Sequence, residues 1–174
     1  KVYNLQMMRM HPTSSQGERL GIVVYRDVYL PMRDGIRLAT DLFRPARDGE
    51  PLPGPFPTIL CRTPYDKTDR RYSEMADFFT PLGYVVALQD LRDRQRSEGS
   101  GDYEHTATPH EGRDGYDTIE WAAAQPWSTG AIGMFGLSYP AAVQWLAPGW
   151  PVVAWIFFTV ALVAGAWDAA IDTW

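Results

Sequence analysis

The stretch GMFGLSYPAA, residues 133–142, combines residue types that could attack a carbonyl group. An apolar run ends at Ser138 and a proline follows two residues later, which predicts a strand, a sharp turn and a helix. In that setting the serine hydroxyl stands above the end of the strand. The next backbone N–H points toward the oxyanion that forms when an ester or amide is attacked. Ser138 is therefore a candidate nucleophile.

The match to the nucleophile motif G-x-S-x-G is incomplete. Gly136 supplies the first glycine, but Pro140 stands where the second glycine belongs. A proline is tolerated in the first turn of a helix, although it restricts the backbone of Tyr139 before it. A serine at this position could equally cap the helix that follows. From this window alone, both interpretations of Ser138 stay open.

No histidine follows Ser138, although hydrolases of this kind supply the acid and then the histidine after the serine. The histidines of the chain are His11, His105 and His110. His110 lies near the start of a predicted helix that precedes the serine, so we do not expect it to be the general base. Asp168 and Asp172 follow the serine too closely to be good candidates for the triad acid.

Composition is that of a globular protein of 174 residues, with 45% apolar and 21% charged residues. The length is sufficient for one domain with a sizeable core. A net charge of −5 argues against a nucleic-acid partner, because phosphates are bound by basic surfaces.

Targeting and redox signals are sparse. The single cysteine, Cys61, excludes an intrachain disulfide and has apolar neighbours, which predicts a buried thiol. Residues 1–20 show no secretory leader pattern and are expected to form a loose lead-in. A cytoplasmic location is the prediction that follows.

Short apolar runs alternate with amphipathic stretches from residue 21 onward. The predicted strands are two within 21–45, joined at Arg33-Asp34-Gly35, then 57–65, 84–90 and 131–138. The predicted helices are 71–83, 111–125 and 139–147, and the long loops are 48–56 and 91–110. Strands that alternate with helices predict an α/β fold with a mostly parallel sheet, and the first hairpin adds an antiparallel edge.

The segment 151–167 carries no charged residue over seventeen positions. This length lies at the lower limit for crossing a bilayer. Val, Ile and Phe between Pro151 and Gly165 favour a buried strand over a membrane helix, but periodicity alone does not separate the two.

Several segments together resemble the cocaine esterase family. These are α/β-hydrolases related to X-prolyl dipeptidyl peptidases and to acylases that act on α-amino acid esters and cephalosporins. The segments are 28–46, 62–67 (RTPYDK), 83–103 and 110–147, and the resemblance covers about residues 22–148.

The resemblance implies a role for three residues. Ser138 matches the nucleophile, the backbone N–H of Tyr139 matches one oxyanion donor, and the phenol of Tyr65 matches the other. It implies an acyl-enzyme mechanism on a small ester or peptide substrate, with no metal or organic cofactor. Asp117, Glu120 and Trp127 would have capping, surface or packing roles.

The sequence also departs from the family. Arg92-Asp93-Arg94 replaces the family's RGR, so an aspartate occupies the position of a turn glycine. The family's cap, triad acid, triad histidine and C-terminal β domain would all follow the matched region. We therefore expect residues 21–174 to be the N-terminal part of an incomplete α/β-hydrolase domain, inactive alone. The alternative is a non-catalytic truncated module that binds a partner or associates with a membrane.

Overall fold

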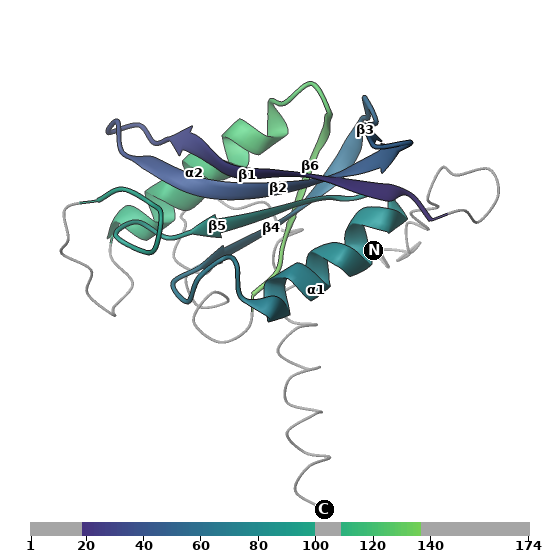
Figure 1. Cartoon of the computed structure of the whole chain (residues 1–174). Coiled ribbons are helices and arrows are strands. Elements are labelled where there is room, and N and C mark those ends of the chain that lie inside the picture. Colours follow the sequence, from purple (N-terminus) through teal and green to yellow (C-terminus); the bar gives the residue numbers. More distant parts are fainter. Residues whose placement is uncertain (1–18, 100–108, 137–174) are drawn as a thin grey trace, which may run out of the picture.

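The computed structural model of the chain describes residues 19–99 and 109–136, and it opens with a β-hairpin (Figure 1). Strands β1 (Gly21–Pro31) and β2 (Arg37–Arg47) pair antiparallel. The turn between them is closed by a 2.8 Å hydrogen bond from the Met32 N–H to the Ile36 carbonyl, and Gly35 has φ +88°. A side chain is disfavoured at that angle, which is why the Arg-Asp-Gly signal predicted this turn correctly.

Strand β1 contains a bulge that the sequence pattern did not predict. The pairing register with β2 shifts between Tyr25 and Val28, and Asp27 adopts φ +50°. The Asp27 N–H donates to the Asp41 carboxylate on β2 at 3.0 Å. The bulge thus brings Asp27 beside a buried carboxylate of the neighbouring strand.

The rest of the sheet consists of the short antiparallel strand β3 and three parallel strands joined through helices. These further elements are β3 (Glu50–Pro51), β4 (Phe56–Thr63), α1 (Arg70–Phe79), η1 (Thr80–Leu82), β5 (Val85–Asp90), α2 (Pro109–Ala123) and β6 (Ser128–Met134). The strand order is β1-β2-β5-β4-β6, with β3 paired to β2. Strand β4 runs parallel to both of its neighbours, and β2 is antiparallel to β5. The predicted mixed α/β sheet with an antiparallel edge is confirmed.

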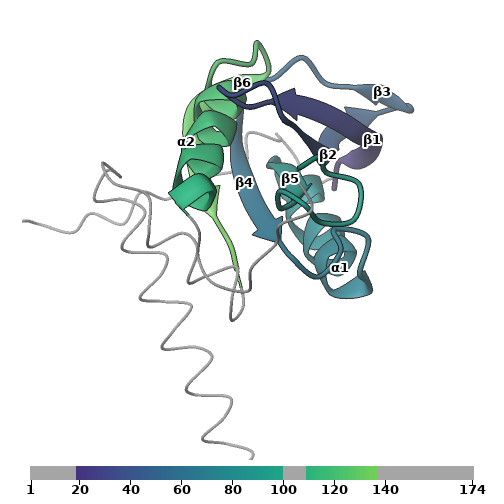
Figure 2. The ribbon, with the colours of Figure 1, turned by 90° about the vertical axis from the view of Figure 1, so that its left-hand side faces the viewer.

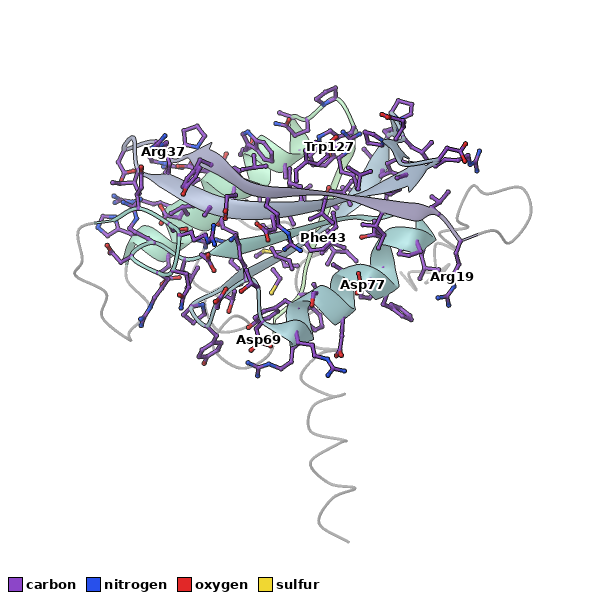
Figure 3. The ribbon with its side chains drawn as sticks, in the orientation of Figure 1. Arg19, Arg37, Phe43, Asp69, Asp77 and Trp127 are labelled. Carbon is purple, nitrogen blue, oxygen red and sulfur yellow. The ribbon has the colours of Figure 1, made fainter. Side chains whose placement is uncertain are left out.

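Helices α1 and α2 cover opposite faces of the sheet (Figure 2). Alternate residues of one strand point to opposite faces, so Cys61 packs in the cluster under α1 and Leu60 in the cluster under α2. Figure 3 shows Phe43 on the face that α1 covers and Trp127 on the other side of the sheet. Two apolar clusters therefore share one sheet.

Strand β6 differs from its prediction. It was expected over 131–138 as a buried strand, but it spans Ser128–Met134 and is half-buried to exposed. Among the described strands it pairs only with β4, so its other edge has no neighbour there. The predicted elements at 139–147 and 151–167 lie outside the described residues. No helix in the described parts of the chain is long and apolar enough to cross a membrane.

The interior strand β5 provides a test of this packing. Leu88 is fully buried under α1, so Leu88→Ala should lower the free energy of unfolding by about 2–5 kcal/mol. Val24→Ala, on the outer strand and 38% exposed, should cost about 1 kcal/mol or less. Urea titrations followed by tryptophan fluorescence measure both, and equal losses would contradict the placement of β5.

Candidate active site

The candidate site lies at the edge of the sheet where the parallel strands end. Thr63 at the end of β4 pairs in register with Asp90 at the end of β5, and Leu60 pairs with Met134 at the end of β6. The Phe135 N–H continues this pairing by donating to the Leu60 carbonyl at 2.9 Å. The loops that follow these strands therefore begin side by side. Sites in open α/β sheets form at this edge.

Tyr65 lies in the loop between β4 and α1, and its side chain is 49% exposed. Its backbone N–H donates to the Thr63 hydroxyl at 3.0 Å. The same hydroxyl lies 2.8 Å from the hydroxyl of Tyr72 in α1. The start of the loop is thus bound to both the strand and the helix, while the phenol ring remains accessible.

Two aspartates order the remainder of this loop. Asp66 has φ +104° and its carboxylate accepts from the N–H and the hydroxyl of Thr68, at 2.8 and 2.7 Å. Asp69 caps α1 by accepting from the Arg71 N–H, and Figure 3 shows it at the beginning of that helix. Hydrogen bonds from the Arg71 side chain and N–H lower the pKa of Asp69 to about 2. Asp69 is therefore ionised at neutral pH, which suits a helix N-terminus.

Lys67, two residues after Tyr65, is buried among three carboxylates. Its Nζ lies 2.8 Å from Asp27, 3.3 Å from Asp41 and 3.5 Å from Asp90. The side chains of Lys67, Asp41 and Asp90 are 1%, 0% and 0% exposed. An ammonium group loses its hydration in such a place and is stable only when paired.

Two guanidinium groups pair with the same carboxylates. Arg26 contacts Asp41 and Arg96 contacts Asp27, each at 2.5 Å. We call the six residues the Lys67 cluster: Asp27, Asp41, Asp90, Lys67, Arg26 and Arg96. It holds three carboxylates and three cations.

Ionisation within the Lys67 cluster follows from burial and pairing. Burial alone would lower the pKa of Lys67, but the hydrogen bond that Lys67 donates to Asp27 and the charges of Asp90 and Asp41 outweigh it and raise this pKa. The hydrogen bond from Lys67 holds the pKa of Asp27 below its ordinary value, whereas burial raises the pKa of Asp90. Lys67 is accordingly a cation throughout the neutral range.

The other candidate groups have no catalytic environment. Burial raises the pKa of Cys61 to about 12, so its thiol is not a nucleophile near neutral pH. His110 is exposed in the first turn of α2. In the described ranges no group of three or more His, Cys, Asp and Glu side chains is arranged to hold a metal ion.

The residues that we expected to have structural roles make ion-pair and packing contacts where the structure describes them. Asp117 accepts from the backbone and side chain of Arg33, with a 2.6 Å ion pair. Trp127 is buried and packs edge-on against Trp121. Asp93 adopts φ +61°, so the aspartate takes up the left-handed backbone in place of the family's glycine.

Several sequence-predicted groups lie outside the described residues. They are Ser138, Tyr139, His11, His105, Asp168 and Asp172. Of the predicted oxyanion and nucleophile residues the structure describes Tyr65 alone. The Lys67 cluster was missed by the sequence analysis, because its carboxylates come from positions 27, 41 and 90 and no local spacing marks them.

A hairpin followed by parallel strands, with helices on opposite faces and a loop residue at the carboxyl edge, defines the N-terminal part of an α/β-hydrolase fold. The chain belongs to the X-Pro dipeptidyl-peptidase (S15) family, whose sequence profile matches residues 34–170.

Individual relatives agree with this membership. The chain is 40% identical over 131 residues to cocaine esterase of Rhodococcus sp. (strain MB1 Bresler), covering 71% of this chain and 21% of that enzyme. It is similar in structure to a CocE/NonD family hydrolase from Staphylococcus aureus (TM-score 0.60, 30% identity, 72% of this chain and 25% of that one). It is also similar to an α-amino acid ester hydrolase (TM-score 0.57, 27% identity, 82% and 25%). The matched region thus spans about a fifth to a quarter of each relative's length.

The Lys67 cluster yields a stability prediction. Lys67→Met should lower the free energy of unfolding by about 3–5 kcal/mol, because it leaves buried carboxylates without their shared cation. Adding Asp41→Asn removes one of these buried carboxylates and should recover part of that loss, since Asp90 still lacks a cation.

A matched control for this prediction lies on α1. Arg70 pairs with Glu74, but these side chains are 88% and 56% exposed, so Arg70→Met should change the free energy of unfolding by about 0.5 kcal/mol or less. Urea titration compares the variants. A Lys67→Met effect as small as that of Arg70→Met would show that burial of the cluster does not matter.

Proposed function

We propose that this chain carries the nucleophile and the oxyanion donors of a serine hydrolase that acts through an acyl-enzyme on Ser138. The observation that carries the proposal is the position of Tyr65. It follows β4, the strand that pairs directly with β6, and the Phe135 N–H just after β6 donates to the Leu60 carbonyl of β4. Ser138 follows Phe135 by three residues in the sequence, which is the basis for assigning it to the same site as Tyr65.

The proposed reaction has two stages, formation of the acyl-enzyme and its hydrolysis. The Ser138 hydroxyl attacks the substrate carbonyl carbon and gives its proton to a general base. The phenol of Tyr65 and the N–H of Tyr139 donate to the oxyanion that forms. The protonated base then gives the proton to the leaving alcohol or amine, and water hydrolyses the acyl-enzyme to release the acid.

The proposed base is a histidine oriented by an acid, as in other α/β-hydrolases. This sequence holds no histidine after Ser138. We assign neither His110 nor Cys61 to this role, since one is exposed on the helix before β6 and the other is a buried neutral thiol. A histidine supplied by further residues of the natural protein fits the fold order best.

An ester is the proposed substrate, in preference to an X-prolyl peptide. The 40% identity to cocaine esterase supports the ester, and RTPYDK around Tyr65 together with GLSY at 136–139 resembles the esterase branch of the family. A tyrosine hydroxyl is a neutral donor near pH 7 and can stabilise the oxyanion of either substrate class.

Labelling and kinetics test the proposal on the natural full-length protein. A fluorophosphonate probe should label Ser138, and Ser138→Ala should abolish both labelling and hydrolysis of a small aryl ester. Tyr65→Phe should lower kcat by about 10²–10³-fold with little change in KM, because it removes one oxyanion donor.

Tyr116→Phe is the control for the phenol. Tyr116 lies on α2 and is 47% exposed, close to the exposure of Tyr65. The Tyr116→Phe variant should therefore retain full activity. The 174-residue chain alone should not be labelled. A full-length protein that resists the probe would favour a non-catalytic module. A full-length protein that keeps its rate without the Tyr65 hydroxyl would overturn the donor role of Tyr65.

A further inference from the structure

Lys67 attaches the loop that carries Tyr65 to the sheet through two kinds of contact. The Lys67 backbone N–H donates to the Asp90 carboxylate at 2.8 Å. Its ammonium contacts Asp27, Asp41 and the other oxygen of Asp90. Both ends of one residue are therefore fixed to groups that do not belong to the loop.

The three carboxylates come from three different strands. Asp27 lies at the bulge of β1, Asp41 within β2 and Asp90 at the end of β5. A loop that follows β4 is thereby attached to the sheet on the side away from β6. A lysine needed only for solubility would be exposed, whereas this ammonium is dehydrated and its pairing depends on position.

Tyr65 is only about half covered by the rest of the protein, at 49% exposed. Its ring is exposed, so the position of the phenol depends on the backbone on either side. Upstream, its N–H is bonded to Thr63, and downstream the chain passes through Asp66 at φ +104° to Lys67. An oxyanion donor must lie within about 0.5 Å of its working position. The backbone anchors therefore decide whether the hydroxyl can serve as one.

We propose that Lys67 is a positioning residue for Tyr65, and that its buried ion pairs with Asp27, Asp41 and Asp90 hold the phenol where it donates to the oxyanion. The inference rests on the proposed role of Tyr65 as a donor. It adds a lysine that touches no substrate and acts through the loop.

A test must separate position from stability, because Lys67→Met alone leaves unbalanced buried carboxylates. Lys67→Met with Asp41→Asn removes the ammonium and keeps the cluster neutral. The amide oxygen of an asparagine at position 41 can still accept the Asp27 N–H, and the Lys67 backbone bond to Asp90 does not involve the replaced side chain. Asp41→Asn alone is the reference for this double variant.

The kinetic test is a cycle on the natural full-length protein with and without the Tyr65 hydroxyl. Relative to Asp41→Asn, the double variant should lose about 10- to 100-fold in kcat for an aryl ester, with KM within about 2-fold. In the Tyr65→Phe background the same change should cost less than about 2-fold, because the hydroxyl that Lys67 positions is already absent. Equal losses in both backgrounds would overturn the proposal.

Hydrogen exchange supplies a readout that does not depend on activity. Amides of residues 65–69 should exchange faster in the double variant than in Asp41→Asn, while those of α2 should be unchanged. Unaltered exchange in 65–69 would exclude a tether, whatever the catalytic rates show.

The outcomes also separate this inference from the proposed function. Suppose that Tyr65→Phe is strongly impaired, and that adding Lys67→Met to Asp41→Asn lowers kcat by the same factor with and without the Tyr65 hydroxyl. Tyr65 is then a donor, but Lys67 does not position it. If Tyr65→Phe is fully active, the donor role fails and the positioning role fails with it. Impairment of Tyr65→Phe together with coupling and faster loop exchange supports both.

Discussion

Strand β4 is the constraint on which the rest of the structure depends. It is hydrogen-bonded to parallel strands on both edges and covered by a helix on each face. Such a strand cannot shift its register by one residue without moving Leu60 and Cys61 to the wrong clusters. The direction in which the chain leaves β4, and hence the start of the Tyr65 loop, is fixed by this arrangement.

Ion pairs then join the hairpin to α2. Arg92 bridges Asp34 in the hairpin turn and Asp114 in the helix, at 2.9 and 2.7 Å. Arg33 in the same turn pairs with Asp117 one turn further along α2. Leu30, Met32 and Leu38 pack beneath these contacts with Trp121 of α2. The apolar contacts thus fix the turn of the hairpin against α2, and the ion pairs orient it.

Much of the fold was predictable because its signals are local. The turn at Arg33-Asp34-Gly35 and the apolar run of β5 are each marked by a few consecutive residues, and both were predicted correctly. The boundaries of β6 were not, since its pairing with β4 extends upstream through Ser128, where no apolar residue marks a strand. Tyr65 was found through a family motif rather than through its own spacing. Lys67 belongs to the same motif, but its burial among Asp27, Asp41 and Asp90 was not predicted, because charges that meet across three strands are recognisable only after folding.

Burial of the Lys67 cluster has a consequence for the response of the protein to ionic strength. Dissolved ions screen charges that face the solvent, and at 0.15 M they do so beyond about 8 Å. The pair of Arg33 and Asp117, and that of Arg37 and Glu98, have guanidinium groups more than half exposed and weaken as salt is added. The ammonium of Lys67 is out of reach of dissolved ions. Added salt should therefore weaken the Arg33 and Arg37 pairs while it leaves the contacts of the Lys67 ammonium with Asp41 and Asp90 largely unchanged.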